Sequence, residues 1–339
     1  MHPLVKLRNQ VKKTHKGLEN LVMFEMLCVK AKKCCFVVAP SGTGKSTVSN
    51  AVSEWYGGKK LKVDVLTRTG LKYLVTTLTG FDGLIVVDDY AKCGTDYARK
   101  LTAVMLAELC FSHYFEVHTA KENYVIQDFF GSAIINAQPV VFNAIVRSDE
   151  WEGAIRDKVL RYYHLLRPVK PNLEPIVIDI DEGISISDVK APNEKSEAFQ
   201  IVLRIARELF STARARIHVK DLLKASAAYD GRNKVKRIDY KIVATCLRQA
   251  HLEKYVLVKK GFETKRNFDH DLYCLLVELA TYKEPTVEQV CLNYGIAKEF
   301  LDSVVLTLRD YVYYKNSPRK LAPTKKTIQI LKEAGYYEH

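Results

Sequence analysis

A glycine-rich segment near the start of the chain carries residues that could bind phosphate. Residues 39–47 read APSGTGKST and directly follow the apolar run 34–38. The glycines let consecutive backbone N–H groups converge on phosphate oxygens, the lysine supplies a positive charge, and the serine hydroxyl can reach Mg²⁺. The order of strand, loop and helix start is that of a Walker A phosphate loop, although Ala39 stands where the first glycine usually does. The residues expected to hold ATP are Ser41, Gly42, Thr43, Gly44, Lys45, Ser46 and Thr47.

An acidic pair follows a second apolar run. Asp88 and Asp89 come directly after residues 83–87, which read GLIVV. At the carboxyl end of a buried strand, such a pair matches a Walker B site. Asp88, together with Ser46, would hold Mg²⁺, and Asp89 would orient or deprotonate the attacking water. The alternative is that both aspartates only cap the helix that follows.

The elements that position these residues must alternate between strands and helices. Such alternation predicts a parallel sheet covered by helices, so the expected fold class is α/β, with the sheet of a P-loop NTPase. In this part of the chain we expect helices at 45–56, 71–78 and 95–110 and strands at 60–66, 83–87 and 132–139.

The positive charge of the 339-residue chain is concentrated in its C-terminal part. The formal net charge is +13, and residues 195–339 hold 27 Lys and Arg against 17 Asp and Glu. Such a basic module indicates a polyanionic partner, most often nucleic acid, although a solvated lysine-rich surface has the same composition. Eight cysteines without metal-ligand spacing argue against structural zinc. No segment resembles a secretory leader or a membrane span, so we expect a soluble, cytoplasmic protein without membrane contact.

The C-terminal part reads as two tandem winged helix-turn-helix modules, mostly α-helical. In such modules the third helix enters the major groove of DNA and the β-wing follows the phosphates. Protein docking, or service as the lid of the ATPase, is the alternative role. The expected elements are helices at 196–209, 218–228 and 238–250 and a strand at 255–258, then helices at 271–281, 286–294 and 297–309, a strand at 311–315 and a last helix at 324–334.

Cations of these modules are the expected DNA contacts, and binding through several phosphates would depend steeply on salt. The first candidate recognition helix is entered by Arg232, Lys234, Lys236, Arg237 and Lys241, and its wing carries Lys259, Lys260, Lys265 and Arg266. The sparser equivalents in the second module are Lys298, Arg319, Lys320, Lys325 and Lys326.

The motifs of residues 20–168 resemble those of the AAA+ ATPases. Two strands at 114–119 and 124–126 read as a hairpin with a basic tip, just before a strand that carries Asn136. The resemblance implies that Asn136 is the polar sensor 1 residue. It also implies that the hairpin corresponds to the pre-sensor insertion of MCM-like and viral superfamily-three helicases, where Lys121, with His118, would touch the nucleic-acid backbone. The alternative is a hairpin that only connects its neighbours.

The same resemblance implies an arginine finger on a helix at 150–158, which is followed by a strand at 159–165. Arg156 can bridge two phosphate oxygens, whereas Lys158 lies nearer the usual place of the finger, so both are candidates. A finger acts on the neighbouring subunit, which implies a homo-oligomer such as a hexameric ring. Two departures from the family are an aspartate, Asp89, in place of the catalytic glutamate, and a proline-rich linker, with one strand at 176–180, where a helical lid would begin. The family also has a sensor 2 arginine, and Arg204, Arg207 and Arg214 are all candidates for it.

Two functions of different class follow from these features. The first is a DNA-dependent ATPase, acting as a helicase, translocase or replication initiator. The second is a nucleotide-gated regulatory switch that resembles the STAND ATPases, with winged helices that dock DNA or protein; a small-molecule kinase is a weaker third possibility. The expected domains are a basic helical segment at 1–33, the ATPase at 34–168, a linker at 169–195 and winged helices at 196–268 and 269–339.

Overall fold

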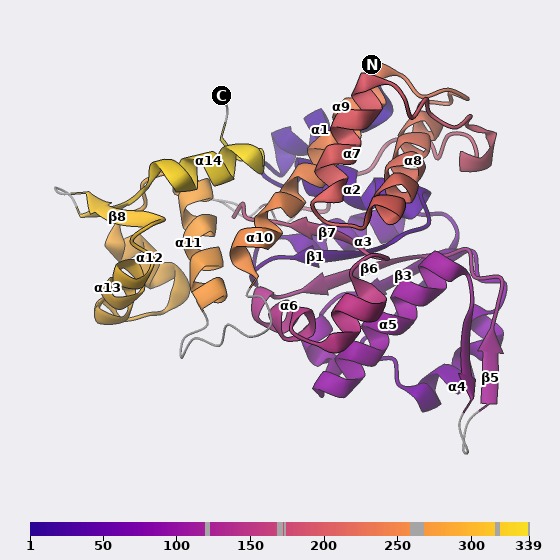
Figure 1. The fold of residues 1–339 in the computed structure, drawn as a ribbon, viewed down its shortest axis with the longest axis horizontal. Helices are drawn as coiled ribbons and strands as arrows, with labels where there is room; N and C mark the ends of the chain where they lie inside the picture. Colours follow the sequence, from indigo (N-terminus) through magenta and orange to yellow (C-terminus); the bar gives the residue numbers. More distant parts are fainter. Residues whose placement is uncertain (119–122, 168–171, 173, 258–267, 316–318, 338–339) are drawn as a thin grey trace.

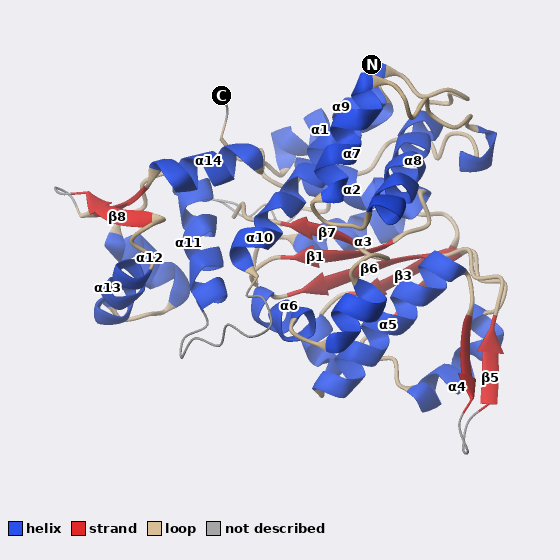
Figure 2. Cartoon of the chain, viewed as in Figure 1, coloured by secondary structure: helices blue, strands red, loops and turns tan. Residues whose placement is uncertain are grey.

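The computed structural model describes residues 1–339 except 119–122, 168–171, 173, 258–267, 316–318 and 338–339. At its centre lies a five-stranded sheet in which neighbouring strands run parallel, in the order β2-β3-β6-β1-β7 (Figure 2). Because β6 lies between β1 and β3, its carboxyl end, which carries Asn136, comes between the phosphate loop and the acidic pair. The strands are β1 Cys34–Val38, β2 Lys59–Lys62, β3 Gly83–Val87, β6 Ser132–Ala137 and β7 Leu160–Tyr163.

Alternate side chains of the central strands enter two separate cores. In β1, Phe36 joins one core and its neighbour Val37 joins the other. Strands buried on both faces need helices on both, and Figure 2 shows them there. One face packs against α4 Arg68–Leu78, α5 Asp96–Ser112 and α6 Pro139–Val146; the other packs against α2 Glu19–Lys30 and α3 Lys45–Trp55. The mixed α/β architecture with a parallel sheet is consistent with the expected P-loop NTPase fold.

The N-terminal segment is part of this domain rather than a separate basic arm. It forms α1 Pro3–Thr14 and α2, and α2 packs against β1, β6 and β7 of the sheet. Nearly every side chain of α2 from Leu21 to Val29 is buried, including Glu25. A helix that is apolar on all sides needs tertiary cover, and the sheet supplies it to α2.

The expected hairpin is confirmed. It consists of β4 Phe115–His118 and β5 Asn123–Ile126, paired antiparallel from Phe115 with Ile126 to His118 with Asn123. The hairpin extends away from the sheet (Figure 1). Lys121 lies outside the described residues.

Several expected elements differ in extent. The helix expected at 150–158 is a single π-helical turn, η2 Trp151–Ile155, and the strand expected at 60–66 ends at Lys62. Residues 176–180 form no strand; Trp55, the last residue of α3, donates from Nε1 to Ile180 O at 2.9 Å. The remaining short turns are η1 Tyr90–Cys93 and η3 Ile186–Asp188.

The first winged helix is not confirmed. Its three helices form, as α7 Glu197–Arg207, α8 Thr212–Tyr229 and α9 Arg237–Arg248, but they pack together and against α1 and α2. The strand expected at 255–258 is wrong: η4 Gln249–Leu252 continues into the helical turn α10 Glu253–Val256. This turn brings Glu253 to the buried Arg161, whose Nε lies 2.5 Å from Glu253 Oε2, a constraint that outweighs local strand propensity. The expected wing cations Lys259, Lys260, Lys265 and Arg266 lie outside the described residues.

The C-terminal module has the element order expected from the sequence. Three helices precede an antiparallel pair and a last helix, and threonine side chains cap α12 and α14 at their N-termini. Figure 1 shows this module at one end of the long axis and the β4–β5 hairpin near the other. Its elements are α11 Phe268–Tyr282, α12 Val287–Tyr294, α13 Lys298–Thr307, β8 Val312–Lys315, β9 Lys320–Pro323 and α14 Lys325–Glu333.

Candidate nucleotide site

The loop after β1 has the backbone that phosphate binding requires. Gly42 and Gly44 have φ of +73° and +89°, a region that residues with a Cβ rarely adopt. A Cβ on Gly44 would also come within 2.9 Å of Leu18 Cδ1, so a side chain there would be both strained and crowded. Lys45 is buried, and its Nζ donates to Pro40 O at 3.2 Å. Burial lowers the pKa of Lys45, and the charges of Asp89 and Asp88 oppose that shift.

A buried histidine supports the loop from the strand beside it. His164, directly after β7, places Nε2 at 3.2 Å from Thr43 O. Burial lowers the pKa of His164 to about 4, so the ring is neutral at physiological pH and Nε2–H is the donor. Thr43 is itself buried, and its hydroxyl donates to Pro40 O at 2.9 Å. Thr43 thus stabilises the conformation of the loop through a hydrogen bond within it.

The acidic pair faces the loop across the sheet edge. Asp88 Oδ1 accepts from Asn136 Nδ2 at 3.4 Å, and Lys62 Nζ lies 3.6 Å from Asp88 Oδ2. Burial would raise the pKa of Asp88, but hydrogen bonds from Ser46 and Asn136 and the charge of Lys62 lower it. Asp88 is therefore ionised and turned toward the serine of the loop.

Asp89 has two roles in the structure. Its Oδ1 accepts from Ala91 N at 3.2 Å as the N-cap of η1, as the capping alternative predicts. Asp89 also lines the cavity beside the phosphate loop. Capping and contact with a bound water are compatible, because a carboxylate has two oxygens.

The cavity at this edge of the sheet has a volume of about 340 Å³. The donor set fits Mg²⁺, which favours oxygen ligands and keeps water and phosphate in its shell. Ser46 and Asp88 would hold the ion, and the described residues contain no cluster of three metal-binding side chains that would indicate a closed metal cage. A bound Mg²⁺ would withdraw charge from the phosphates. The cavity is lined by Ser41, Gly42, Gly44, Lys45, Ser46, Thr47, Asp88, Asp89, Lys92 and Gln138.

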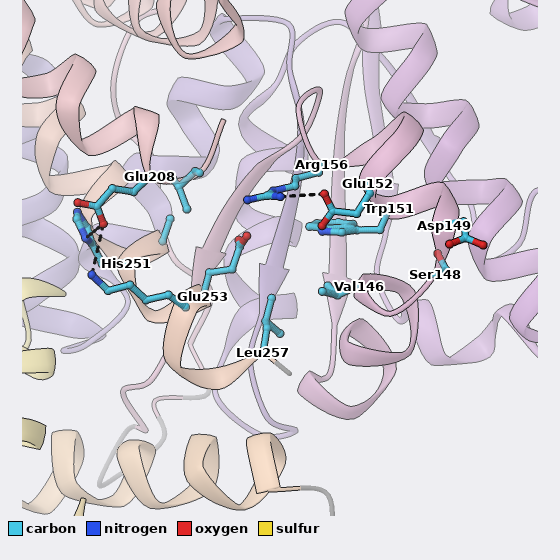
Figure 3. Close-up of a pocket in the computed structure, with 13 residues that line it drawn as sticks. Val146, Ser148, Asp149, Trp151, Glu152, Arg156, Glu208, His251, Glu253 and Leu257 are labelled. Carbon is cyan, nitrogen blue, oxygen red and sulfur yellow. Dashed lines mark hydrogen bonds and ion pairs between the residues drawn. The ribbon is translucent and has the colours of Figure 1, made fainter. Parts of the chain in front are cut away.

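Both finger candidates lie elsewhere. Arg156 lines a larger cavity of about 510 Å³ between η2 and the turn η4–α10, and its Nη1 donates to Glu152 Oε2 at 2.8 Å (Figure 3). The guanidinium is half-exposed. Lys158 is mostly buried in an ion pair with Glu108. Of the two, Arg156 is the more accessible to a second molecule.

The sensor 2 candidates do not join the cavity of the phosphate loop. Arg204 and Arg207 are exposed on α7, and the Arg214 guanidinium stacks at 4.0 Å over the ring of Phe111. None of the three is among the residues that line the cavity.

Most of the cations expected to contact DNA at the first candidate recognition helix are exposed. Lys234, Lys236 and Arg237, together with Lys190, line a surface cavity of about 430 Å³ at the starts of α7 and α9, and Lys241 is exposed on α9. Arg232 differs, because its Nη2 lies 2.9 Å from Asp239 Oδ1 and its Nε 2.5 Å from Asp230 Oδ2.

In the C-terminal module the expected cations are scattered. Lys298, Lys325 and Lys326 are exposed, and Lys320 is half-buried. Arg319 is held by Asp302 at 2.9 Å and lies over the Tyr314 ring.

Several residues near the site were not expected from the sequence. Lys92 and Gln138 line the cavity, and His164 supports the loop. Gln138 and His164 come directly after β6 and β7, which is the one local signal that could have found them; Lys92 lies in η1, five residues after the end of β3. Ser49 and Glu25 lie behind Asn136 and have no such signal, because each reads as an ordinary helix residue.

The chain matches no known protein family by its sequence, and no curated protein matches it. Solved structures that are similar over most of its length include the following three. One titled Drosophila ORC bound to DNA has 11% identity and a TM-score of 0.26, with 98% of this chain and 92% of that chain covered. The apo C-terminal region of NrS-1 has 11% identity and a TM-score of 0.31, with 96% and 76% covered. The RuvB Holliday junction branch migration motor of Thermotoga maritima has 12% identity and a TM-score of 0.24, with 98% and 95% covered.

With TM-scores this low, none of these likenesses decides the fold or the function of the chain. Among the described residues, no helix combines the length and the apolar character that a bilayer crossing requires.

Proposed function

We propose that the chain is an ATP-hydrolysing, DNA-binding motor, of the helicase, translocase or replication-initiator class. The observation that carries the proposal is the meeting of the phosphate loop, Asp88 and Asn136 at one edge of a parallel sheet, with Asn136 Nδ2 3.4 Å from Asp88 Oδ1. Binding of a nucleotide alone needs only the loop. An acidic pair and a polar side chain opposite the loop are what hydrolysis adds.

Each residue of the site has a distinct task in hydrolysis. Lys45 offsets the charge that develops on the terminal phosphate, and Asp88 with Ser46 holds Mg²⁺. Asp89 orients the water and accepts its proton as the water oxygen bonds to phosphorus and the bond to the leaving diphosphate breaks. Asn136, between the two groups, positions the attacking water.

Charge supports DNA as the partner. Residues 195–339 carry ten more Lys and Arg than Asp and Glu. Lys190, Lys234, Lys236 and Arg237 gather around one surface cavity with no acidic side chain in its lining, a pattern that suits a phosphate backbone. The module of residues 268–337, with its three helices and hairpin, serves as the winged helix. Both sites bind DNA, single-stranded or duplex, and Lys121 with His118 forms a third contact.

A homo-oligomer, such as a hexameric ring, completes the active unit. The cavity with Arg156 and that of the phosphate loop share no lining residue, so Arg156 serves the nucleotide of a neighbouring copy. Lys158 contributes less than Arg156 to this contact with the neighbouring nucleotide, because Glu108 already neutralises its charge. The functional units are an ATPase at 1–167, a helical unit at 174–257 and the winged helix at 268–337.

A second candidate is a nucleotide-gated regulatory switch. Asp89 favours it, because this side chain is one methylene shorter than glutamate and already caps η1. Slow hydrolysis would leave a retained nucleotide that sets the conformation. In that case the basic surfaces dock DNA or a protein without turnover.

Steady-state ATP hydrolysis, measured with and without single-stranded and duplex DNA, separates the two candidates. The Lys45→Ala variant is the blank, and Lys60→Ala, an exposed lysine on β2, is the matched control. A severalfold rise in rate with DNA, absent in Lys45→Ala and kept in Lys60→Ala, supports the motor. A rate equal to the blank, together with nucleotide that copurifies, supports the switch.

A further inference from the structure

We propose that Glu25 is a positioning residue for hydrolysis, which fixes the orientation of the Asn136 amide through the hydroxyl of Ser49. This inference rests on the proposed ATPase function. It adds a residue outside the cavity to the groups that set the geometry of the site.

The three side chains form one continuous hydrogen-bonded line. Ser49 Oγ donates to Glu25 Oε1 at 3.0 Å, and Asn136 Nδ2 donates to Ser49 Oγ at 3.0 Å. Asn136 Nδ2 also lies 3.4 Å from Asp88 Oδ1. The line therefore runs from α2 through α3 and β6 to the carboxylate that faces Ser46.

Glu25 determines which neighbour receives the hydroxyl proton of Ser49, and therefore which groups in the line donate and which accept. Ser49 has one hydroxyl proton, and its Oγ lies 3.0 Å from Asn136 Nδ2, 3.2 Å from Lys45 O and 3.3 Å from Asn136 Oδ1. When the proton goes to Glu25, the free lone pairs of Ser49 accept from the amide nitrogen, and that same nitrogen faces Asp88. Without Glu25, that proton can go to Lys45 O or to Asn136 Oδ1, so the orientation of the amide is no longer fixed. The amide oxygen would then compete for the position beside the Asp88 carboxylate, where it is repelled.

The carboxyl group is not explained by packing. Glu25 is completely buried on a helix whose other buried side chains are almost all apolar, and among the described residues its Oε2 has no hydrogen-bond partner. An unpaired buried polar atom destabilises the fold, so an apolar residue would serve a structural role better. Burial, opposed by the Ser49 hydrogen bond and aided by the charge of Asp88, raises the pKa of Glu25. Glutamine keeps an acceptor oxygen at this position and does not titrate.

The test compares Glu25→Leu, Glu25→Gln and Ser49→Ala in the full chain. Because misplacement of a catalytic group costs rate rather than binding, we expect Glu25→Leu to lower kcat about tenfold or more with KM for ATP unchanged. We expect Glu25→Gln to keep kcat within about twofold, because it retains the acceptor. Glu19→Gln is the matched control, since this second buried carboxyl of α2 accepts from Gly17 N and touches no member of the line.

A double-mutant cycle separates a shared role from two independent defects. Glu25→Leu combined with Ser49→Ala should lose no more kcat than the worse single variant, because both changes break the same line. Three results would each overturn the proposal. They are losses of kcat that add in the double variant, a fall in ATP affinity as large as the loss of kcat, and a wild-type kcat in Glu25→Leu. If Glu25→Leu does not fold, Ser49→Ala and Glu25→Gln still provide the decisive kcat comparison.

A spectroscopic readout keeps this inference distinct from the ATPase proposal. The side-chain amide resonances of Asn136, identified by their loss in Asn136→Asp, should match between wild type and Glu25→Gln and differ in Glu25→Leu. Unchanged resonances in Glu25→Leu refute the positioning role whether or not the protein hydrolyses ATP. Hydrolysis no faster than that of Lys45→Ala, with shifted resonances, refutes only the proposed ATPase.

Discussion

The hydroxyl of Tyr273 lies 2.9 Å from the carbonyl oxygen of Val38, the last residue of the strand that enters the phosphate loop. The same hydroxyl lies 3.0 Å from His164 O, and Tyr273 is completely buried. Tyr336 also reaches this strand pair, because its hydroxyl donates to Tyr163 O at 2.6 Å. Two tyrosines of the C-terminal module thus hold the backbone of β1 and β7 where the nucleotide site begins.

Removal of the Tyr273 hydroxyl should weaken communication between DNA and ATP. Tyr273→Phe keeps the ring and loses hydrogen bonds worth about 1 kcal/mol in stability. We expect DNA to bind with unchanged affinity but to stimulate hydrolysis less than in wild type. Tyr294→Phe is the control, because the Tyr294 hydroxyl donates to Cys274 O within the same module. Equal stimulation in both variants would rule out this route of coupling.

The buried His164 should make the stability of the fold depend on pH. Burial lowers the pKa of His164 to about 4, below the ordinary value of 6.5. Above pH 6.5 both the folded and the unfolded protein carry a neutral ring, and the full stability is present. As the pH falls from 6.5 to about 4, only the unfolded chain takes up the proton, so the free energy of unfolding falls by an amount on the order of 3 kcal/mol.

Urea unfolding between pH 4 and 8 checks this effect with His164→Gln. Glutamine can still donate to Thr43 O but does not titrate, so the variant should lose less stability on acidification than wild type. Other groups titrate equally in both proteins and cancel in the difference. Parallel pH profiles would mean that His164 does not contribute.

Arg156 should act on a neighbouring copy. Arg156→Ala is expected to lose most ATPase activity while ATP affinity stays, whereas Lys158→Met, which breaks the pair with Glu108, should alter stability more than rate. Mixing inactive Arg156→Ala with inactive Lys45→Ala should restore part of the activity, because an intact loop then meets an intact arginine. Mixtures that stay inactive would argue against a site shared between subunits.

Local pattern was enough to predict the parts of the site that follow strands. The phosphate loop, the acidic pair after β3 and Asn136 in β6 are each marked by an apolar run and a change to polar residues, and the expected strand β6 and hairpin β4–β5 formed. The parallel sheet then brings these separate positions to one edge without further information.

Contacts between distant segments were beyond local pattern. Glu25 and Ser49 are 24 residues apart, and neither stands out in its helix. The strand expected at 255–258 failed because Glu253 turns toward the buried Arg161, a partner 92 residues away. The first winged helix therefore depended on a strand propensity that a tertiary ion pair overrides.

Arg232 and its basic neighbours should separate into a structural and a DNA-binding class. Arg232 pairs with the buried Asp239, whose pKa burial would raise but hydrogen bonds from His2, Arg232, Lys236 N and Ser226 lower to about 2. Arg232→Ala leaves that charge without its arginine partner and should destabilise the fold by about 3 kcal/mol, as thermal or urea unfolding would measure. Lys234→Ala and Arg237→Ala should leave stability unchanged and each reduce the slope of log K against log salt by about one. If Arg232→Ala weakens DNA binding without a loss of stability, or the other two unfold the protein, this division is incorrect.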